Sequence, residues 1–582
     1  MATARKFHVE LIKPSHYDDD GYVIQWQKAW IPSNSLACLY GIALQAAADK
    51  ALGPDVEIAV DGYDETNTII PLADIVRRIC EAAQSAGDGA PGGVVCLVGV
   101  QSNQFPRAMD LARRLRAEGI EVAIGGFHVS GCLSMLAELP PDLQEAVDLG
   151  ITLFAGEAEG RFAPFLSDVW HRRSSGVYNY MNDLPGLQQA VTPFLPNRIV
   201  ERYIQCIGAF DAGRGCPFQC SFCTIINVQG RKSRWRDADD VERLVRDMLA
   251  QGVTRFFITD DNFARNRNWE PIFDRLIHMR EEEKLSLQFI IQVDTLCHRI
   301  PNFIAKAKRA GCTRVFIGLE NVNPENLMAV KKRQNRIKEY RRMLQAWRAE
   351  KVITYAGYIL GFPADTPASI ERDIRVIQRE LPIDLLEFFV LTPLPGSEDH
   401  QKLHRDGVWM DPDMNKYDLE HVLTGHAKMG PQEWQDIYNR AWSLYYSDDH
   451  VKTLMRRARA SGIKPVRLMQ HVLQFHGFFK FERVHPLQAG NFRRKVRRSR
   501  RSGLPIESPL VFYPRRVWEM VTTYGGLALY AWRLNRIRKQ VQREQAGYTD
   551  LALTPVSDDD EETMEMLQSA KPAKPTAAVA AE

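Results

Sequence analysis

The chain has 582 residues, which is too long for one ordinary hydrophobic core and predicts two or three domains. Hydrophobic residues make up 45% of the sequence and charged residues 25%, with a net charge of +3, as in soluble globular proteins. Ten cysteines are too few for the disulfide framework of a secreted scaffold, and the N-terminus lacks the apolar core of a signal peptide. We therefore expect a cytoplasmic protein with reduced thiols.

The first 190 residues alternate strand-like and helical segments. The strand-like segments are residues 7–12, 56–60, 94–100, 121–125 and 151–155, and a helical run covers 105–118. This alternation predicts a doubly wound (Rossmann-like) sheet, in which ligands bind at the loops beyond the strand ends. We expect this domain and its linker to span residues 1–190.

The loops after these strands are rich in glycine and short polar side chains. They read Gln101-Ser-Asn103, Gly125-Gly-Phe-His-Val-Ser130 and Gly156-Glu-Ala-Glu-Gly160. Glycine lets a ligand approach the backbone closely. The candidate ligand-binding residues of this domain are Ser102, Gly125, Gly126, Ser130, Gly156 and Glu157.

Three cysteines share one short run, Gly213-Arg-Gly-Cys-Pro-Phe-Gln-Cys-Ser-Phe-Cys223. The thiolates of Cys216, Cys220 and Cys223 can converge on a four-iron, four-sulfur (4Fe-4S) cluster and leave one iron without a protein ligand, since such clusters normally take four cysteines. A zinc site would need a fourth Cys or His, and residues 224–230 supply none. The run therefore predicts a 4Fe-4S cluster with an open iron.

The middle of the chain predicts a second parallel sheet. Candidate strands are residues 204–210, 255–260, 287–293, 314–320, 353–361 and 385–392, with helical segments such as 241–251, 300–310 and 370–379 between them. Continuous apolar strands alternating with helices indicate a parallel sheet covered by helices, and in a barrel of this kind functional groups collect at the carboxyl ends of the strands. The cysteine run follows the first of these strands. We expect this domain to span residues 191–430.

The cysteine run resembles the cluster loop of the radical S-adenosylmethionine (radical SAM) superfamily, and the aromatic Phe222 before its last cysteine fits that family as well. The resemblance implies a partial barrel of six βα units. It also implies that S-adenosylmethionine (SAM) binds the open iron through its amino and carboxylate groups.

Other strand ends match the family in part. Asp260 and Asp261 stand where the family usually has Gly-Gly-Glu near the SAM amino group, and Glu320 ends the fourth strand. The segment Gly357-Tyr-Ile-Leu-Gly361 resembles the G-x-I-x-G that packs against adenine, although Ala364 replaces the glutamate expected three residues later. Helix capping or a surface ion pair is the alternative for each carboxylate. The predicted SAM contacts are Phe222, Asp260, Asp261, Glu320, Gly357 and Gly361.

The glycine-rich loops of the first domain, taken in order, resemble the cobalamin-binding domain of radical SAM enzymes. The general cobalamin hallmark D-x-H-x-x-G, whose histidine is the lower cobalt ligand, is broken here. His16 lies in the right loop, but Pro14 replaces the aspartate and Gly21 is displaced. We expect cobalamin to bind without His16 as its ligand. A vestigial domain that binds nothing is the alternative.

The C-terminal region, residues 431–550, predicts a helical and basic segment. An aromatic helix covers 432–447, seven of the nine residues from 493 to 501 are Lys or Arg, and 510–534 is apolar and aromatic. This composition is typical of a segment that lies in a membrane interface, and docking onto the protein's own barrel is the alternative. Nucleic acid is an unlikely partner. The composition of residues 551–582 predicts a disordered tail.

The resemblance as a whole implies a cobalamin-dependent radical SAM protein of the class B methyltransferase type. SAM cleavage would give a radical that abstracts a substrate hydrogen, and methylcobalamin would supply a methyl group to an unactivated carbon. The alternatives are a cyclase or rearrangement enzyme without net methylation and a non-catalytic iron–sulfur or cobalamin sensor. The expected partners are a lipid or natural-product substrate, an electron donor of the flavodoxin or ferredoxin type, and the inner face of a membrane. The sequence indicates no catalytic acid or base.

Overall fold

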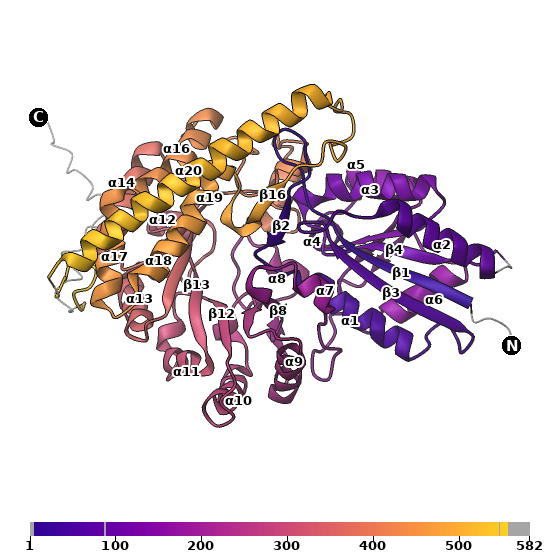
Figure 1. Ribbon diagram of the computed structural model, residues 1–582, viewed down its shortest axis with the longest axis horizontal. Coiled ribbons are helices and arrows are strands. Elements are labelled where there is room, and N and C mark those ends of the chain that lie inside the picture. Colours follow the sequence, from indigo (N-terminus) through magenta and orange to yellow (C-terminus); the bar gives the residue numbers. More distant parts are fainter. Residues whose placement is uncertain (1–4, 87–88, 546, 557–582) are drawn as a thin grey trace, which may run out of the picture.

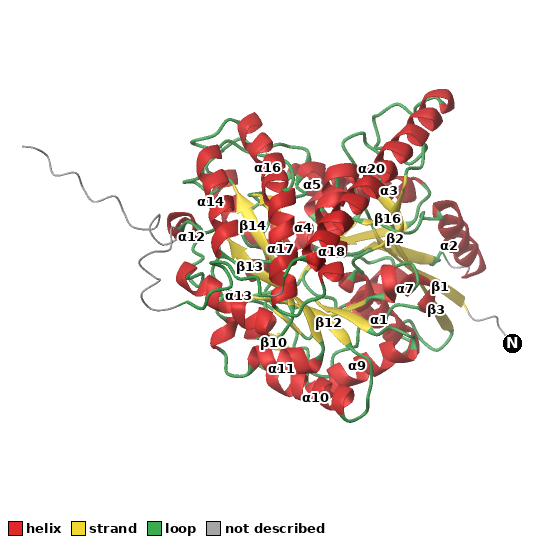
Figure 2. Ribbon diagram, turned by 60° about the vertical axis from the view of Figure 1, so that its left-hand side comes forward, coloured by secondary structure: helices red, strands yellow, loops and turns green. Residues whose placement is uncertain are grey.

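The computed structural model describes residues 5–86, 89–545 and 547–556. Within these ranges, two parallel sheets of six strands each organise the molecule, one toward each end (Figure 1). In Figure 2 the strands lie inside and helices surround them. From residue 557 on, the tail predicted over 551–582 lies outside the described residues.

The N-terminal sheet has the strand order β3-β1-β4-β5-β6-β7, with all neighbours parallel. Its strands are β1 (Arg5–Lys13), β3 (Val56–Asp64), β4 (Gly93–Leu97), β5 (Glu121–Gly125), β6 (Thr152–Ala155) and β7 (Val177–Asn179). Helices α1 (Asn34–Ala48) and α6 (Phe162–Trp170) belong to one buried apolar cluster, and α2 (Leu72–Ala86) and α3 (Phe105–Ala117) belong to another. The predicted doubly wound sheet is confirmed. The three-residue strand β7 was not predicted.

The second sheet is also parallel, with the order β15-β14-β13-β12-β11-β8. Its strands are β8 (Gly208–Phe210), β11 (Arg255–Ile258), β12 (Gln288–Val293), β13 (Cys312–Glu320), β14 (Ile353–Leu360) and β15 (Leu385–Val390). Helices α9 (Ala238–Ala250), α10 (Trp269–Glu281), α11 (Phe303–Ala310), α13 (Tyr340–Ala349) and α14 (Pro367–Glu380) alternate with these strands along the chain. The predicted order of βα units is confirmed, although the first strand is shorter than expected.

Strand β13 shows how this sheet divides its two faces. Val315, Ile317 and Leu319 are fully buried, whereas Phe316 and Gly318, which alternate with them, are only partly buried. Successive side chains of a strand point to opposite faces, so the first set packs under the covering helices and the second faces the barrel interior. Polar residues at the ends of these strands are thereby brought to one edge.

The C-terminal region packs on the barrel and then returns to the N-terminal domain. Helix α16 (Pro431–Tyr445) packs against α14 and β15, and α17 (Asp448–Ala460) and α18 (Pro465–Val472) follow it. Strand β16 (Gly490–Arg494) then pairs antiparallel with β2 (Gln25–Ala29), which lies more than 450 residues earlier in the chain. The long helix α20 (Pro509–Arg543) crosses the molecule after this strand (Figure 1). Neither β2 nor β16 was predicted.

The basic run at 493–501 makes most of its contacts within the protein. Arg493 pairs with Asp18 at 2.7 Å, and Arg501 pairs with Asp413 at 2.8 Å. Two further members of the run, Lys495 and Arg500, also form ion pairs with carboxylates of the chain. The expectation that this whole run faces an anionic surface is therefore wrong. These residues fasten the C-terminal region to the N-terminal domain and to the loop after the barrel.

In the described part of the chain, none of the helices has an apolar stretch of the length needed to cross a bilayer. For α20 the reason is visible in its sequence, because charged residues recur along it.

Candidate functional site

The three-cysteine loop lies at the carboxyl end of β8, where a parallel barrel collects its functional groups. A two-residue strand pair, β9 (Gly213–Arg214) with β10 (Arg234–Trp235), closes the base of the loop. Within the loop, the backbone N–H of Cys216 donates to the carbonyl of Gly230 at 3.2 Å, and that of Ser221 donates to the carbonyl of Val330 at 3.0 Å. The backbone of the cysteine run is therefore held in place by the barrel.

The chemistry of the thiols fits a cluster better than a single metal ion. Burial, with a smaller contribution from the other thiols, raises the pKa of Cys216 to about 11 and that of Cys223 to about 12. Metal ligation requires the thiolate form, and bound iron would supply positive charge that stabilises these buried thiolates. Among the described residues, no three Cys, His, Asp or Glu side chains converge closely enough to hold one metal ion. In a 4Fe-4S cube each cysteine binds a different iron.

Two side chains missed by sequence reasoning lie against the cysteines. The side-chain amide of Gln334 donates to Sγ of Cys220 at 3.3 Å. The ammonium group of Lys332 lies 5.7 Å above the ring of Phe222 and forms a buried ion pair with Glu320. Burial acts to lower the pKa of Lys332, but Glu320 and the nearby thiols overcome it and raise that pKa. Hydrogen bonds and charges next to the sulfurs set the reduction potential of a cluster.

The structure brings Glu320 to the predicted site but does not leave it free. It is the last residue of β13, has a left-handed backbone (φ 62°), and its carboxylate contacts Lys332. The carboxylate is thus in a buried ion pair rather than the surface pair considered as the alternative, and its contact with SAM stays a prediction. No local pattern could indicate this partner, because Lys332 stands twelve residues after Glu320, beyond a helix.

Asp260 and Asp261 have different environments despite their adjacency. The carboxylate of Asp260 accepts hydrogen bonds from the backbone N–H groups of Ala212 and Gly213 at 2.7 and 2.8 Å, and another from Asn266. Asp260 therefore holds the chain that enters the cysteine loop. Burial raises the pKa of Asp261 to about 7, helped by the Asp260 charge, and Asp261 is close enough to Cys216 to influence its pKa. Of the two, Asp261 is better placed to receive a cationic group.

The two glycines of the G-x-I-x-G segment make room for aromatic rings of the protein itself. A Cβ on Gly357 would lie 3.0 Å from the ring of Phe316, and one on Gly361 would lie 1.8 Å from Trp434 of α16. The turn after Gly361 is held by Asp365, which accepts hydrogen bonds from the N–H groups of Gly361 and Phe362 at 2.9 and 3.0 Å. Asp365 was not predicted, although it lies one residue beyond the position where a carboxylate was sought.

A second site is a cavity of about 180 Å³ at the carboxyl edge of the N-terminal sheet. Five of the six predicted residues line it: Gly125, Gly126, Ser130, Gly156 and Glu157. The sixth, Ser102, does not line the cavity; it hydrogen-bonds Nδ1 of His128 at 3.1 Å. The wall is mostly apolar, with residues from β4, β5, β6, α1 and α6. A flat heterocycle with a polar rim would suit such a lining.

Gly126 is the position where this cavity needs glycine. Its φ is 149°, and a Cβ there would lie 2.1 Å from the backbone nitrogen of Val100. A side chain would therefore have to push two strand ends apart. The loop is also held by Ser130, whose Oγ accepts a hydrogen bond from the N–H of Gly156 at 3.0 Å.

The cavity lies between the two sheets rather than within one domain. Arg214, Val228 and Gln229, which flank the cysteine run, complete its wall. A ligand in the cavity would therefore touch the segments that carry the cluster cysteines.

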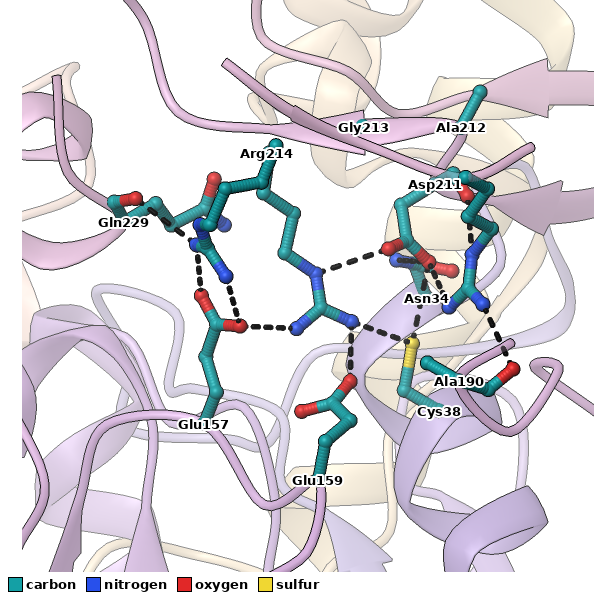
Figure 3. A network of polar contacts seen from close by, with 12 residues as sticks. Asn34, Cys38, Glu157, Glu159, Ala190, Asp211, Ala212, Gly213, Arg214 and Gln229 are labelled. Carbon is teal, nitrogen blue, oxygen red and sulfur yellow. Dashed lines mark hydrogen bonds and ion pairs between the residues drawn. The ribbon is translucent and has the colours of Figure 1, made fainter. Parts of the chain in front are cut away.

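A network of buried charges joins the domains at this wall (Figure 3). Arg214 pairs with Glu157 at 2.7 Å, with Glu159 at 2.6 Å and with Asp211 at 2.9 Å. Arg234 also binds Glu157, through both of its terminal nitrogens. Burial acts to raise the pKa of Asp211, but Arg214 and a second arginine overcome it and lower that pKa to about 2. Glu157, predicted as a ligand contact, is thus shared by two arginines of the barrel domain.

His16 lies away from the cavity. It is buried, and burial lowers the pKa of its imidazole to about 4. Its surroundings include Gln488 of the C-terminal region, and it is absent from the residues that line the cavity.

The fold and these two sites together define an α/β enzyme that joins a Rossmann-like domain to a cysteine-bearing parallel barrel. Residues 212–377 match the family model of the radical SAM superfamily, so the barrel of this chain is a radical SAM domain. This family implies a 4Fe-4S cluster and SAM as cofactors.

The relatives include proteins named as a methyltransferase and a methylase. The chain is 27% identical to bacteriochlorophyllide d C-12(1)-methyltransferase of Chlorobaculum tepidum over 60% of this chain and 74% of that protein. It is 26% identical to hopanoid C-2 methylase of Rhodopseudomonas palustris over 62% of this chain and 66% of that protein. Among solved structures, radical SAM methyltransferase TsrM from Kitasatospora setae, with cobalamin and a 4Fe-4S cluster bound, matches with a TM-score of 0.57 at 14% identity, covering 80% of this chain and 99% of that chain. At this identity the structural match shows a shared fold.

Proposed function

We propose that this enzyme is a cobalamin-dependent radical SAM methyltransferase that acts on an unactivated carbon of an amphiphilic substrate. The observation that carries the proposal is the shared cavity, in which glycines of the N-terminal sheet face Arg214 and Gln229 beside the cluster cysteines. A cobalamin held there would lie next to the SAM site, as transfer between the two cofactors requires. The cluster with SAM would supply the radical chemistry and cobalamin the methyl group.

The residues of this chain would have separate tasks in that reaction. Cys216, Cys220 and Cys223 would hold the cluster, and Asp261 would receive the amino group of SAM. The amide of Gln334, at 3.3 Å from the Cys220 sulfur, would stabilise negative charge on the cluster. The cavity would hold the nucleotide tail of cobalamin against the glycine loops, without His16 as cobalt ligand.

The substrate class is proposed from the relatives, two of which bear the names of a bacteriochlorophyllide methyltransferase and a hopanoid methylase. We propose a large, mainly apolar ring compound such as a hopanoid-like lipid. The reducing electron would come from a protein of the flavodoxin or ferredoxin type.

The test is an anaerobic assay of cluster-loaded protein with SAM, cobalamin, a reduced flavodoxin as electron donor and a lipid extract of the host cells. With SAM carrying a deuterated methyl group, we expect 5′-deoxyadenosine and a lipid whose mass rises by that labelled methyl group. Cys220→Ala should abolish both products, whereas Cys206→Ala, which changes a cysteine outside the run, should retain them. Formation of 5′-deoxyadenosine with an altered but unmethylated product would support the cyclase alternative and contradict methyl transfer. Full activity in protein free of cobalt would contradict the cobalamin assignment.

A further inference from the structure

Helix α20 has two apolar faces, and only one of them is covered by the protein. The covered face includes Phe512, Tyr530, Leu534, Ile537 and Val541, all of which are buried. The other face exposes large apolar side chains to solvent, with Leu510 86% and Trp518 68% exposed. The remaining exposed members are Val511, Tyr513, Val517, Met520, Val521, Leu529 and Trp532.

The exposed residues form a continuous stripe. At 100° per residue, Leu510, Val517, Val521 and Trp532 lie within a sector of about 60°, and the other exposed apolar residues flank this sector on both sides. The buried residues 512, 530, 534 and 541 lie on the opposite side of the helix. A stripe that runs for six turns is not a set of scattered surface apolar residues, and patches of this kind mark interaction sites.

The charge of the helix is strongly one-sided. Between residues 509 and 543 there are seven Lys or Arg and a single acidic residue, Glu519. Glu519 points toward the body, where it pairs with Arg516 and Lys495. The outer face of α20 therefore carries no carboxylate.

The apolar stripe continues into a free basic cluster on the same face. Arg536, Lys539 and Arg543 follow Trp532 at helical spacing and are exposed. In the part of the chain that the structure describes, none of the three has an ion pair, and Arg536 stacks over the ring of Trp532 at 4.8 Å. These cations differ from the 493–501 run, most of whose members have internal partners.

We propose that the outer face of α20 is a docking surface for an anionic phospholipid membrane. Tryptophan and aliphatic side chains would enter the interface between headgroups and acyl chains, and the basic cluster would meet lipid phosphates. A membrane is favoured over a second copy of the chain because the outer face offers its three unpaired cations no carboxylate. The N-terminal end of α20 stands out from the rest of the ribbon, at the top of Figures 1 and 2, so a flat surface can reach it. This inference does not depend on the proposed methyl transfer.

The test uses the full chain with vesicles of phosphatidylcholine alone and of phosphatidylcholine mixed with phosphatidylglycerol. We expect co-sedimentation with the mixed vesicles that weakens with salt without disappearing, because salt screens the charge contribution and leaves the apolar one. Val517→Gln combined with Trp518→Gln and Val521→Gln should lower the partition coefficient at least tenfold. Trp409→Gln is the matched control, since Trp409 is 65% exposed but lies outside α20.

A second variant tests the basic cluster without touching the stripe. Replacing Arg536, Lys539 and Arg543 by Gln should weaken binding to mixed vesicles on the order of 100-fold, at roughly 1 kcal/mol per cation, and should leave binding to neutral vesicles unchanged. The proposal would be overturned if the wild-type protein failed to bind the mixed vesicles. It would also be overturned if Trp409→Gln lowered the partition coefficient as much as the triple change at Val517, Trp518 and Val521. A wild-type dimer in light scattering that the Val517, Trp518 and Val521 changes convert to monomer would overturn it too, because the stripe would then join two copies.

Discussion

Removal of the Glu157 carboxylate should destabilise the contact between the two domains by several kcal/mol. Glu157 is 11% exposed and binds both Arg214, 10% exposed, and Arg234, 14% exposed. Removing one partner of a buried pair costs about 3–5 kcal/mol, because the remaining charge is left desolvated. In Glu157→Ala, Arg234 loses its carboxylate partner whereas Arg214 keeps Glu159 and Asp211, so we expect the lower part of that range, about 3 kcal/mol.

Two control variants distinguish the cost of breaking a buried ion pair from the cost of breaking an exposed one. Asp61→Ala breaks an ion pair whose members, Asp61 and Arg198, are 36% and 50% exposed, and it should cost at most about 1 kcal/mol. The loss of stability in Glu159→Ala should lie between those of Glu157→Ala and Asp61→Ala, because Glu159 pairs with Arg214, which keeps Glu157 and Asp211 as partners.

Urea unfolding of cluster-loaded protein provides the measurement. For a chain whose unfolding free energy changes by a few kcal/mol per molar urea, Glu157→Ala should lower the first midpoint by roughly 1 M or more. Its iron content should also fall, because Arg214 lies two residues before Cys216. A midpoint shift no larger than that of Asp61→Ala would refute the reasoning, as would a Glu157→Ala and Arg234→Ala double-mutant cycle with no coupling energy.

Three further predictions follow from buried features of the two domains. In an absorbance titration, Gly126→Ala should abolish cobalamin binding, because its Cβ would overlap a backbone nitrogen at 2.1 Å. The control is Gly53→Ala, at φ 103° with open space around it, which should lower the unfolding free energy by about 1 kcal/mol and bind cobalamin normally. Glu387 is fully buried without a hydrogen-bond partner among the described residues, and burial raises its pKa from 4.5 to about 8. The folded protein therefore binds this proton more tightly than the unfolded chain, so stability should fall as pH rises from about 5 to about 8. Glu387→Gln should flatten that fall in melting curves, and an unchanged pH profile would contradict it. Gln334→Leu should lower the cluster midpoint potential in a redox titration, because the sulfur of Cys220 loses its 3.3 Å donor; an equal or higher potential would exclude that role.

Local patterns were sufficient to predict the architecture and the cysteine loop. Strand and helix periods are properties of short segments, and their alternation predicted both parallel sheets in the observed order. Three cysteines within eight residues predicted a cluster loop because a short loop keeps them near one another wherever it lies. Gly126 was predicted because glycine lets a ligand approach the backbone, but the contact that requires glycine there, with the backbone of Val100, is a tertiary one.

The tertiary structure decided which charges meet. Glu157 and Arg214 are 57 positions apart, and Arg493 and Asp18 are 475 apart, so no spacing rule could pair them. The same holds for β2 and β16, whose edges match only after both domains have formed. For this reason the basic run at 493–501 was predicted to contact an external surface, although most of its members pair within the protein. The exposed stripe of α20 could be recognised only after the structure showed which face of the helix is packed. Periodicity is fixed by the local backbone, whereas the partner of a charged side chain is fixed by long-range packing.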